Sequence, residues 1–284
     1  MIEPLTAEFP VNALCLALDV PRSGYYQWLK RVPGKRAKAN GQLLEHIEKS
    51  YNESRQSYGS PRITQELRRQ NMGCGKNRVA RLMKEHNIRA KGKQPFRPRT
   101  TDSKHGEPAA PNLLKSTSSV RLNQVWVADI TYIWTAITGW VYLAAVMDLC
   151  SRKIVGWSIS LSMETILVKE ALKQALAMRR PAPGLLHHSD RGIQYASSAF
   201  RALLGNFQII PSMSAKGNCY DNAAMESFWS TLKTELGSNF QDINAARLAI
   251  FDYIETFYNR RRLHSALGFR SPVEFEQTLN AKKN

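Results

Sequence analysis

The sequence predicts an α/β protein of the α+β type, in which small all-helical units precede a larger domain built on one mixed five-stranded sheet. Residues 11–90 carry short patterns of helical period, whereas from Gln124 three runs rich in Val, Ile, Trp and Tyr precede alternating helices and strands. The charge divides at the same place. Residues 1–124 hold 23 Lys and Arg against 10 Asp and Glu, and residues 125–284 hold 17 against 13.

The net charge of +17 indicates a polyanionic partner, because each contact with a phosphate releases condensed counterions. Nucleic acid is the leading candidate, and we expect the basic N-terminal part to bind it. The sequence shows neither the ~18 consecutive apolar residues of a membrane span nor a leader pattern, so we expect a cytoplasmic protein without a membrane partner. The four cysteines form no CxxC pair, which argues against a zinc module.

Residues 1–40 are predicted to form a helix-turn-helix-like segment followed by a basic linker. Within residues 11–31, two short helical patterns flank the breaker DVPRSG. The linker is KRVPGKRAKANG, residues 30–41. An ordinary helical hairpin explains residues 11–31 about as well as a DNA-reading motif does.

Residues 41–90 are predicted to form a helical DNA-binding domain of three helices. The segment LLEHIEKSYNES is amphipathic, Ser60-Pro61 begins a second helix, and the third helix spans GCGKNRVARLMKEHN. The simplest interpretation of the basic residues on the outer face of this domain is that they are solvated. Few acidic residues lie between them, however, which favours contact with phosphates. We therefore expect phosphate contacts from Arg68, Arg69, Arg78 and Arg81.

Residues 91–123 are rich in Pro, Gly, Ser and Thr and predict a linker, after which residues 124–284 form the larger domain with a C-terminal helical basic tail. Three strands joined by short turns predict an antiparallel meander over residues 124–160. The expected later elements are a helix over Glu164–Met178, a strand over 184–189, a helix over Ser197–Leu204, a strand over 208–212, and helices over Asn222–Leu236 and Ile243–Tyr258.

Three acids in this larger domain stand out by position. Asp129 interrupts an apolar strand, Asp190 follows a strand in HHSDRG, and Glu226 lies in the first turns of an amphipathic helix. Each acid alone has a structural explanation. Asp129 could be a core acid with hydrogen-bond partners, Asp190 a residue that forms a turn, and Glu226 a first-turn acid that interacts with the helix dipole. A carboxylate in a buried strand is nevertheless costly unless it is paired or metal-bound.

The ordered motifs around these acids resemble the DDE transposases and retroviral-type integrases, and most closely the second-frame (OrfB) product of two-frame bacterial insertion sequences. They are WVADITYI, DLCSRKIVGW, HHSDRGIQY, KGNCYDNAAMESFWSTLKTE and YNRRRLHSALGFRSPVEF. The likeness runs from about Leu43 to Phe275, and the 35 residues between Asp190 and Glu226 fit the family's spacing. It implies an RNase H-like integrase catalytic core.

The resemblance implies that Asp129, Asp190 and Glu226 are catalytic and hold two Mg²⁺ ions, with Mn²⁺ able to replace them. Asp129 would bridge both ions, and the other two acids would hold one each. Two such ions activate the attacking oxygen and stabilise the leaving oxygen of an in-line phosphodiester displacement. Water would first free a 3′-hydroxyl at the end of the element, and that hydroxyl would then attack a second phosphodiester.

Other residues receive supporting roles. Lys233 lies on the same helix face as Glu226, and we expect it to contact DNA near the cut, although a surface lysine is the plain alternative. His188 and Ser189 could orient Asp190, although packing at a strand end explains them nearly as well. Asp148 ends a strand and is better explained by a turn. The basic run Arg260, Arg261 and Arg262 is expected to contact phosphates.

The resulting prediction is a transposase that cleaves and joins DNA strands in transposition, recombination and integration. A non-catalytic DNA-binding regulator or targeting subunit is the alternative, and an RNase H-like nuclease acting on RNA hybrids or junctions is a third. The expected partners are the ends of the element, target DNA and further copies of the chain on DNA. The resemblance adds an upstream reading-frame product, joined by a frameshift, and a location at the bacterial nucleoid.

Overall fold

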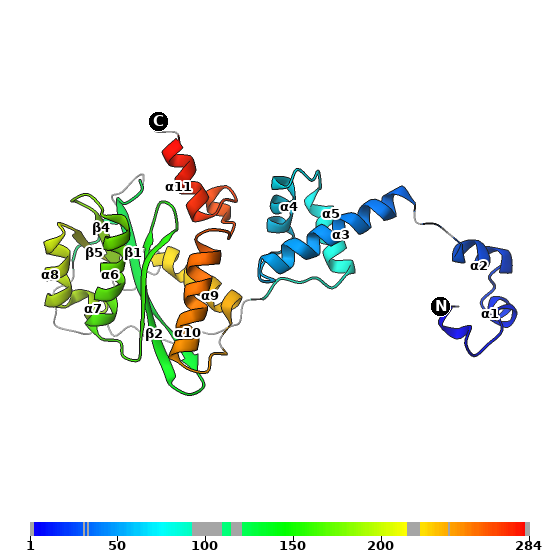
Figure 1. The fold of residues 1–284 in the computed structure, drawn as a ribbon, viewed down its shortest axis with the longest axis horizontal. Coiled ribbons are helices and arrows are strands. Elements are labelled where there is room, and N and C mark those ends of the chain that lie inside the picture. Colours follow the sequence, from blue (N-terminus) through cyan, green and yellow to red (C-terminus); the bar gives the residue numbers. More distant parts are fainter. Residues whose placement is uncertain are drawn as a thin grey trace.

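The computed structural model describes residues 3–30, 32, 34–92, 110–114, 121–214, 222–237 and 239–281. The N-terminal helices are α1 (Val11–Ala17), α2 (Arg22–Leu29), α3 (Lys35–Glu53), α4 (Ser60–Arg69) and α5 (Lys76–Glu85) (Figure 1). Both predicted helices of residues 11–31 and all three of residues 41–90 are present. The linker predicted over residues 30–41 is wrong from Lys35 onward, because KRAKAN lacks Gly and Pro and extends α3 by almost two turns.

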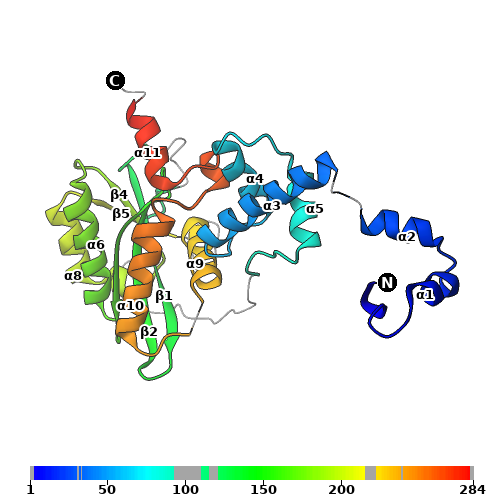
Figure 2. The same ribbon diagram turned by 45° about the vertical axis from the view of Figure 1, so that its right-hand side comes forward.

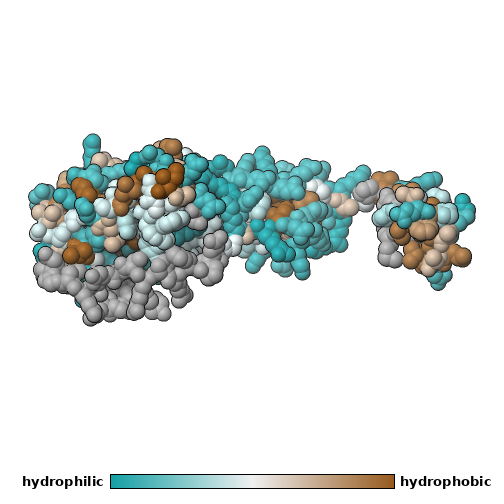
Figure 3. Space-filling model, turned by 90° about the horizontal axis from the view of Figure 1, so that it is seen from below, coloured by the Kyte–Doolittle hydropathy of each residue, from teal (hydrophilic) through white to brown (hydrophobic). Residues whose placement is uncertain are grey.

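The unit formed by α1 and α2 exposes a large apolar surface. Leu16, Trp28 and Leu29 are exposed to 87%, 55% and 50%, and hydrophobic residues gather on this unit at the right of Figure 3. Residues 1–30 carry two basic and three acidic side chains, so the chain's positive charge does not lie here. The composition of this segment is therefore less suited to phosphate contact than that of the helices that follow.

The larger domain is built on a five-stranded sheet in the order β3-β2-β1-β4-β5. The strands are β1 (Val125–Thr135), β2 (Gly139–Asp148), β3 (Ile154–Ser160), β4 (Leu186–Ser189) and β5 (Ile210–Met213). The first three form the predicted antiparallel meander, and β4 and β5 add to it in parallel. The predicted mixed sheet is confirmed.

Helices cover both faces of this sheet. They are α6 (Thr165–Arg179), α7 (Ile193–Ala196), α8 (Ser198–Asn206), α9 (Ala223–Leu236), α10 (Ile243–Phe251) and α11 (Pro272–Ala281). Alternate residues of β1 separate two cores: Val125 and Val127 pack with residues of α9 and α10, while Trp126 and Ala128 pack with residues of α6 and α8 (Figure 1). Successive side chains of β1 point to opposite faces of the sheet, and this determines which helices each side chain packs against.

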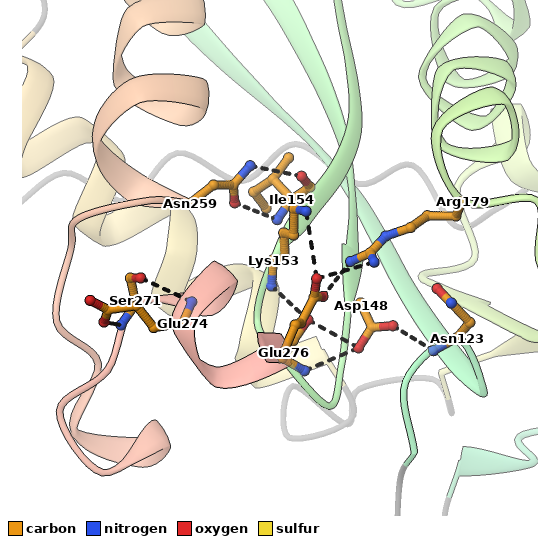
Figure 4. Close-up of polar contacts among 10 residues, drawn as sticks. Asn123, Asp148, Lys153, Ile154, Arg179, Asn259, Ser271, Glu274 and Glu276 are labelled. Atoms are coloured by element: carbon orange, nitrogen blue, oxygen red, sulfur yellow. Dashed lines mark hydrogen bonds and ion pairs between the residues drawn. The ribbon is translucent and has the colours of Figure 1, made fainter. Parts of the chain in front are cut away.

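The expected helix over Ile243–Tyr258 is α10 continued by a π-helical segment, Asp252–Tyr258. Directly after it, the Asn259 side chain accepts from the Ile154 amide and donates to the Ile154 carbonyl, both at 2.9 Å. Asn259 therefore pairs with the main chain of β3, the strand at one end of the sheet order, as a neighbouring strand would (Figure 4).

Helix α11 lies in the C-terminal helical tail that the sequence predicts without bounds, although Ser271-Pro272 at its start repeats the Ser60-Pro61 signal of α4. Its Glu276 forms ion pairs with Arg179, at the end of α6, and with Lys153, just before β3 (Figure 4). These contacts fix the C-terminal helix to the core.

The unit formed by α3, α4 and α5 packs against the C-terminal part of the core, as Figure 2 shows. Tyr58 accepts from the Leu263 amide at 2.7 Å, and Arg62 Nε donates to the Leu263 carbonyl at 3.0 Å. Arg55 pairs with Asp252 at 2.8 Å. Part of the basic helical surface is therefore already occupied by the core.

In the part of the chain that the structure describes, none of the helices combines the length and the apolar character that crossing a membrane requires.

Gly156 provides a direct test of how tightly β3 packs on α6. A Cβ at this position would lie 2.2 Å from the Ala171 carbonyl oxygen and 2.7 Å from the Ala175 amide nitrogen, both main-chain atoms. We expect Gly156→Ala to lower the free energy of unfolding by roughly 3 kcal/mol or more, because the backbones must separate. Denaturant unfolding of the full chain measures the change.

Gly205→Ala is the matched control, since Gly205 lies in α8 and a Cβ there meets nothing within 4 Å. Alanine should leave stability unchanged or raise it by up to ~1 kcal/mol. Equal effects of the two substitutions would contradict the close approach of β3 and α6.

Candidate active site

The sheet brings Asp129 and Asp190 to the same place. Strands β1 and β4 pair in parallel from Val125 opposite Leu186 to Val127 opposite His188. Continuing this register by two residues sets Asp129 opposite Asp190, and alternation directs both side chains to the face on which α9 packs. Asp190 lies just beyond β4, where its Oδ1 accepts from the Gly192 amide at 3.0 Å.

Helix α9 adds the third acid. Glu226, Trp229 and Lys233 are spaced by three and four residues, so they share one helix face. Trp229 Nε1 donates to Asp129 Oδ2 at 3.0 Å, which turns this face toward the sheet acids. Glu226 itself is exposed, in the first turn of the helix.

The electrostatics of Asp129 reflect the neighbouring acids. The pKa of Asp129 is raised to about 7, first by burial and then by the charges of Asp190 and, less strongly, Glu226, while hydrogen bonds from Ile130 and Trp229 act in the opposite direction. The buried Tyr195 also has a raised pKa, caused first by burial and then by Asp129 and Asp190. The site thus concentrates negative charge in a place where charge is poorly solvated.

The three acids do not form a closed cage. Among the residues that the structure describes, no group of three His, Cys, Asp or Glu side chains is close enough together to hold one ion. Asp129 and Asp190 come from adjacent positions on the sheet, whereas Glu226 lies on the more accessible helix. The side chains therefore share one region but do not yet surround a common point.

His188 and Ser189 lie where a supporting role places them. The ring nitrogens of the fully buried His188 are 2.9 Å from Ser212 Oγ and 3.1 Å from Ser214 Oγ. Ser189 Oγ donates to the main-chain carbonyl of Asp190 at 3.0 Å. These bonds fix the end of β4 and the start of the turn that carries Asp190.

Asp148 has the turn role predicted for it. It is fully buried, and its carboxylate accepts from the amides of Asn123, Cys150 and Ser151 at 2.7 to 3.0 Å (Figure 4). The same carboxylate also accepts a hydrogen bond from the Ser151 hydroxyl. These bonds close the turn between β2 and β3.

Lys233 lies beside the acids. Its Nζ is 4.6 Å from the centre of the Tyr132 ring, and the nearby charge of Asp129 acts to raise its pKa, although burial lowers it overall. A half-buried cation next to a carboxylate cluster is well placed to neutralise a phosphate.

The predicted phosphate contacts in the helical unit divide into two pairs. Arg68 and Arg81 are exposed, and Arg81 has only a 3.6 Å ion pair within its own helix. Arg78 instead donates to Asn40 Oδ1 at 2.8 and 3.0 Å, joining α5 to α3, and Arg69 pairs with Glu274 of α11.

The prediction that Arg262 contacts DNA is wrong. Its guanidinium is 5% exposed and makes three hydrogen bonds of 2.6 to 3.1 Å to the buried Glu235 carboxylate, which also accepts from Tyr253 at 2.8 Å. Burial of this pair attaches the end of α9 to the C-terminal segment. Arg260 and Arg261 are exposed, with Arg261 3.7 Å from Glu53.

Two contributors were missed from the sequence: Trp229 as a donor to Asp129, and the Glu235–Arg262 pair. The i, i+3 spacing of Glu226 and Trp229 could have indicated the first of these. Nothing local indicates the second, because its partners are 27 residues apart.

Comparison with known families agrees with this geometry. Residues 120–219 and 208–272 match models described as "Integrase core domain", and residues 38–96 match one described as "HTH-like domain". The helix-turn-helix match thus falls on α3 to α5, and residues 11–31 lie outside it.

Several known proteins are similar to the chain. It is 44% identical over 267 residues to the "Insertion element IS600 uncharacterized 31 kDa protein" of Shigella sonnei, covering 93% of this chain and 97% of that protein. It is 41% identical over 282 residues to "Transposase InsF for insertion sequence IS3A" of Escherichia coli (strain K12), covering 97% and 96%. Among solved structures, the HTLV-2 integrase catalytic core domain in complex with magnesium aligns with a TM-score of 0.42 and 17% identity, covering 54% of this chain and 96% of that one.

The fold and the site together define a polynucleotidyl transferase with an integrase core and a helix-turn-helix-like DNA-binding domain. The chain belongs to the transposases of IS3-type insertion sequences. The predicted family, fold class and activity in DNA transposition and integration are confirmed, which rules against the non-catalytic alternative as its main function.

The raised pKa of Asp129 predicts a pH dependence of stability in metal-free buffer. Folded Asp129 keeps its proton to about pH 7, whereas an unfolded aspartate loses it near pH ~3.9. The free energy of unfolding therefore falls as the pH rises from about 4 to 7 and levels off above. Asp129→Asn should remove this loss and be more stable than the parent by roughly 2–4 kcal/mol at pH 7, as measured by denaturant unfolding.

Asp252→Asn is the control with the opposite sign. The pKa of Asp252 is lowered, first by its hydrogen bond from Thr256 and further by Arg55, so this variant should lose stability above about pH 4. A constant difference between Asp129→Asn and the parent at every pH would contradict a raised pKa for Asp129.

Proposed function

We propose that Asp129, Asp190 and Glu226 hold the divalent ions of the transposase, which we take to be two Mg²⁺ with Mn²⁺ able to replace them. An integrase core implies dependence on divalent metal, and the donor set fits it. The observation that carries the proposal is the partly buried Asp129 carboxylate beside Asp190 and the α9 face, whose pKa is raised by desolvation and then by the neighbouring acid charges. Carboxylate oxygens are the ligands that Mg²⁺ prefers, and a cation would relieve this repulsion.

When bound, the ions would activate the attacking oxygen and stabilise the leaving oxygen of the phosphodiester. The chain's own residues prepare the site. Trp229 and the Ile130 amide each hold one oxygen of Asp129, and the Gly192 amide holds Asp190. Glu226, on the accessible side of α9, can approach once DNA and ions are present. Glu226 lies apart from Asp129 and Asp190, as expected for a site whose ligands come together only when DNA is bound.

The reaction then requires two displacements. In the first, water attacks the phosphodiester at the end of the element, and the bond to the 3′ oxygen breaks. In the second, that 3′-hydroxyl attacks a target phosphodiester, whose own 3′ oxygen leaves. Lys233 would neutralise a phosphate oxygen beside Asp129 during both displacements.

For the DNA-binding surface we propose the exposed cations of α4 and α5. Arg69 and Arg78 contact other helices, Arg69 through Glu274 of α11 and Arg78 through Asn40 of α3, so we assign the phosphate contacts to the exposed cations Arg68, Lys76, Arg81 and Lys84. Arg260 and Arg261 extend the basic surface on the core, and phosphate contacts from this set would fix the register of the DNA.

We also infer that the chain acts as a homo-oligomer on DNA, at the nucleoid, together with the upstream reading-frame product as a frameshift fusion. Two element ends must be held together for strand transfer, and the sequence contains no heptad run that would form a zipper. The apolar surface of α1 and α2 supports this assembly, because it is large for so small a unit.

Replacing the acids with their amides tests the site. Asp129→Asn, Asp190→Asn and Glu226→Gln should each lower the rates of cleavage and strand transfer by at least about 10³-fold, because charge that holds the metals is lost. DNA affinity should change less than about threefold, since the basic surface is intact. Gel-resolved cleavage of a duplex carrying the element's terminal repeat measures this, with and without the upstream product.

Glu170→Gln is the matched control, since Glu170 is an exposed acid on α6 whose partner is Lys173. It should cleave at the parent rate. Near-parental strand transfer by Glu226→Gln would show that the site has been assigned wrongly.

The salt dependence of binding tests the DNA surface. If phosphates dominate, the logarithm of affinity falls linearly with the logarithm of salt concentration. Arg68→Glu and Arg81→Glu should each weaken binding to all sequences alike and reduce that slope by about one. Arg247→Glu, at an exposed position on α10, is the control that should leave the slope unchanged. Parental slopes in both helical-unit variants would exclude this surface.

A further inference from the structure

A row of aromatic side chains leads away from the active site along the β1–β2 hairpin. The Trp140 ring packs edge-to-face with both Tyr132 and Trp134, each at 5.0 Å between ring centres. Trp134 is 48% exposed and Trp140 is 44% exposed. Two neighbouring tryptophans with nearly half their surface in water are unusual on a folded domain, where large aromatic rings are mostly covered.

Lys233 connects this row to the candidate site. Tyr132 and Trp134 follow Asp129 by three and five residues, so strand alternation directs their side chains to the sheet face opposite to that of Asp129. Lys233 Nζ lies 4.6 Å from the centre of the Tyr132 ring, and the charge of Asp129 acts on the same lysine. In the described part of the sheet, β4 pairs with β1 only at Val125–Val127. Among the described residues, β1 then has no second partner strand until the bridge from Thr135 to Phe240, and the contact between Tyr132 and Lys233 lies beside this stretch.

The hairpin that carries the row is held in place. The amides of Ala136 and Ile137 donate to the carbonyls of Phe240 and Gln241 at 2.9 and 2.7 Å, which fastens the hairpin tip to the segment after α9. Thr135 pairs with Phe240 in the same region. The tryptophans thus have a fixed relation to α9 and its acid, as a preformed binding surface requires.

The chemistry of this surface fits a nucleobase. Exposed aromatic rings beside a cation are the combination by which proteins hold unpaired bases: the rings stack on the bases while the cation neutralises the backbone. The phosphodiester that reacts is expected beside Asp129, so a strand that leaves the site past Lys233 and crosses the edge of β1 would reach the tryptophans on the other face of the sheet.

We infer that Trp134 and Trp140 form a stacking site for an unpaired base of the DNA strand that crosses the active site. The inference rests on the proposed function of the three acids. Tyr132 and Trp134 lie three and five residues beyond Asp129, or ~10 and ~17 Å along the strand. At the ~3.4 Å rise of stacked nucleotides, the base lies about three to five nucleotides from the cut phosphate.

The test uses the full chain and a duplex carrying the element's terminal repeat, with 2-aminopurine at successive positions outward from the cut. Stacking on tryptophan quenches this base. Binding of the parent should lower its emission at about the third to fifth positions, and Trp134→Ala and Trp140→Ala should restore it. Affinity for a duplex mismatched at those positions should fall about tenfold in either variant.

Trp140→Phe should retain most of the quenching, because it keeps an aromatic face. Phe207→Ala, which removes a 49% exposed ring at the end of α8, should behave as the parent. Identical emission profiles for the parent and both Trp→Ala variants would overturn the inference. So would loss of self-association in light scattering with unchanged DNA emission, because that result would make the tryptophans a contact with a second copy.

The readout needs only binding and not cleavage. If the amide variants of the three acids still cleaved DNA, the proposed metal site would fail while the emission profile still reported on Trp134 and Trp140. If the amide variants were inactive and the profile was flat, the stacking site alone would fail.

Discussion

The hydrogen bond from Trp229 to Asp129 is the interaction on which the organisation of the active site depends. It joins the central strand of the sheet to α9, and through α9 it brings Glu226 and Lys233 to the same edge. A partly buried carboxylate beside another acid is unfavourable, and two hydrogen bonds to Asp129 only partly offset that cost. A cation bound there, as proposed, would relieve this cost and stabilise the folded chain.

The opposite end of α9 is fixed by a different means. Glu235 is buried with Arg262 and Tyr253, and its main-chain carbonyl accepts from Lys91 Nζ at 3.0 Å. A buried ion pair contributes little net stability but is costly to break, because either partner alone would be an uncompensated charge. The pair thus determines where α9 lies, and with it the helical unit that contacts the same segment.

The elements of the core could be predicted because their signals are local. The meander follows from three β-rich runs with short turns, and Asp129 and Asp190 could be identified because they break or end such runs. Arg262 could not be placed, since an arginine after a helix has the local pattern of a surface residue and its burial depends on Glu235 in another helix. The start of α3 at Lys35 was missed because the basic residues 35–40 were interpreted as a linker, although most of them are good helix formers.

Anomalous diffraction from crystals of the chain bound to its element end and soaked in Mn²⁺ tests the central claim most directly. Two peaks about 3.5–4 Å apart are expected, both in contact with Asp129, one also with Asp190 and the other with Glu226. Peaks that do not touch Asp129, or a DNA-bound site in which Glu226 stays outside the coordination of both ions, would contradict it.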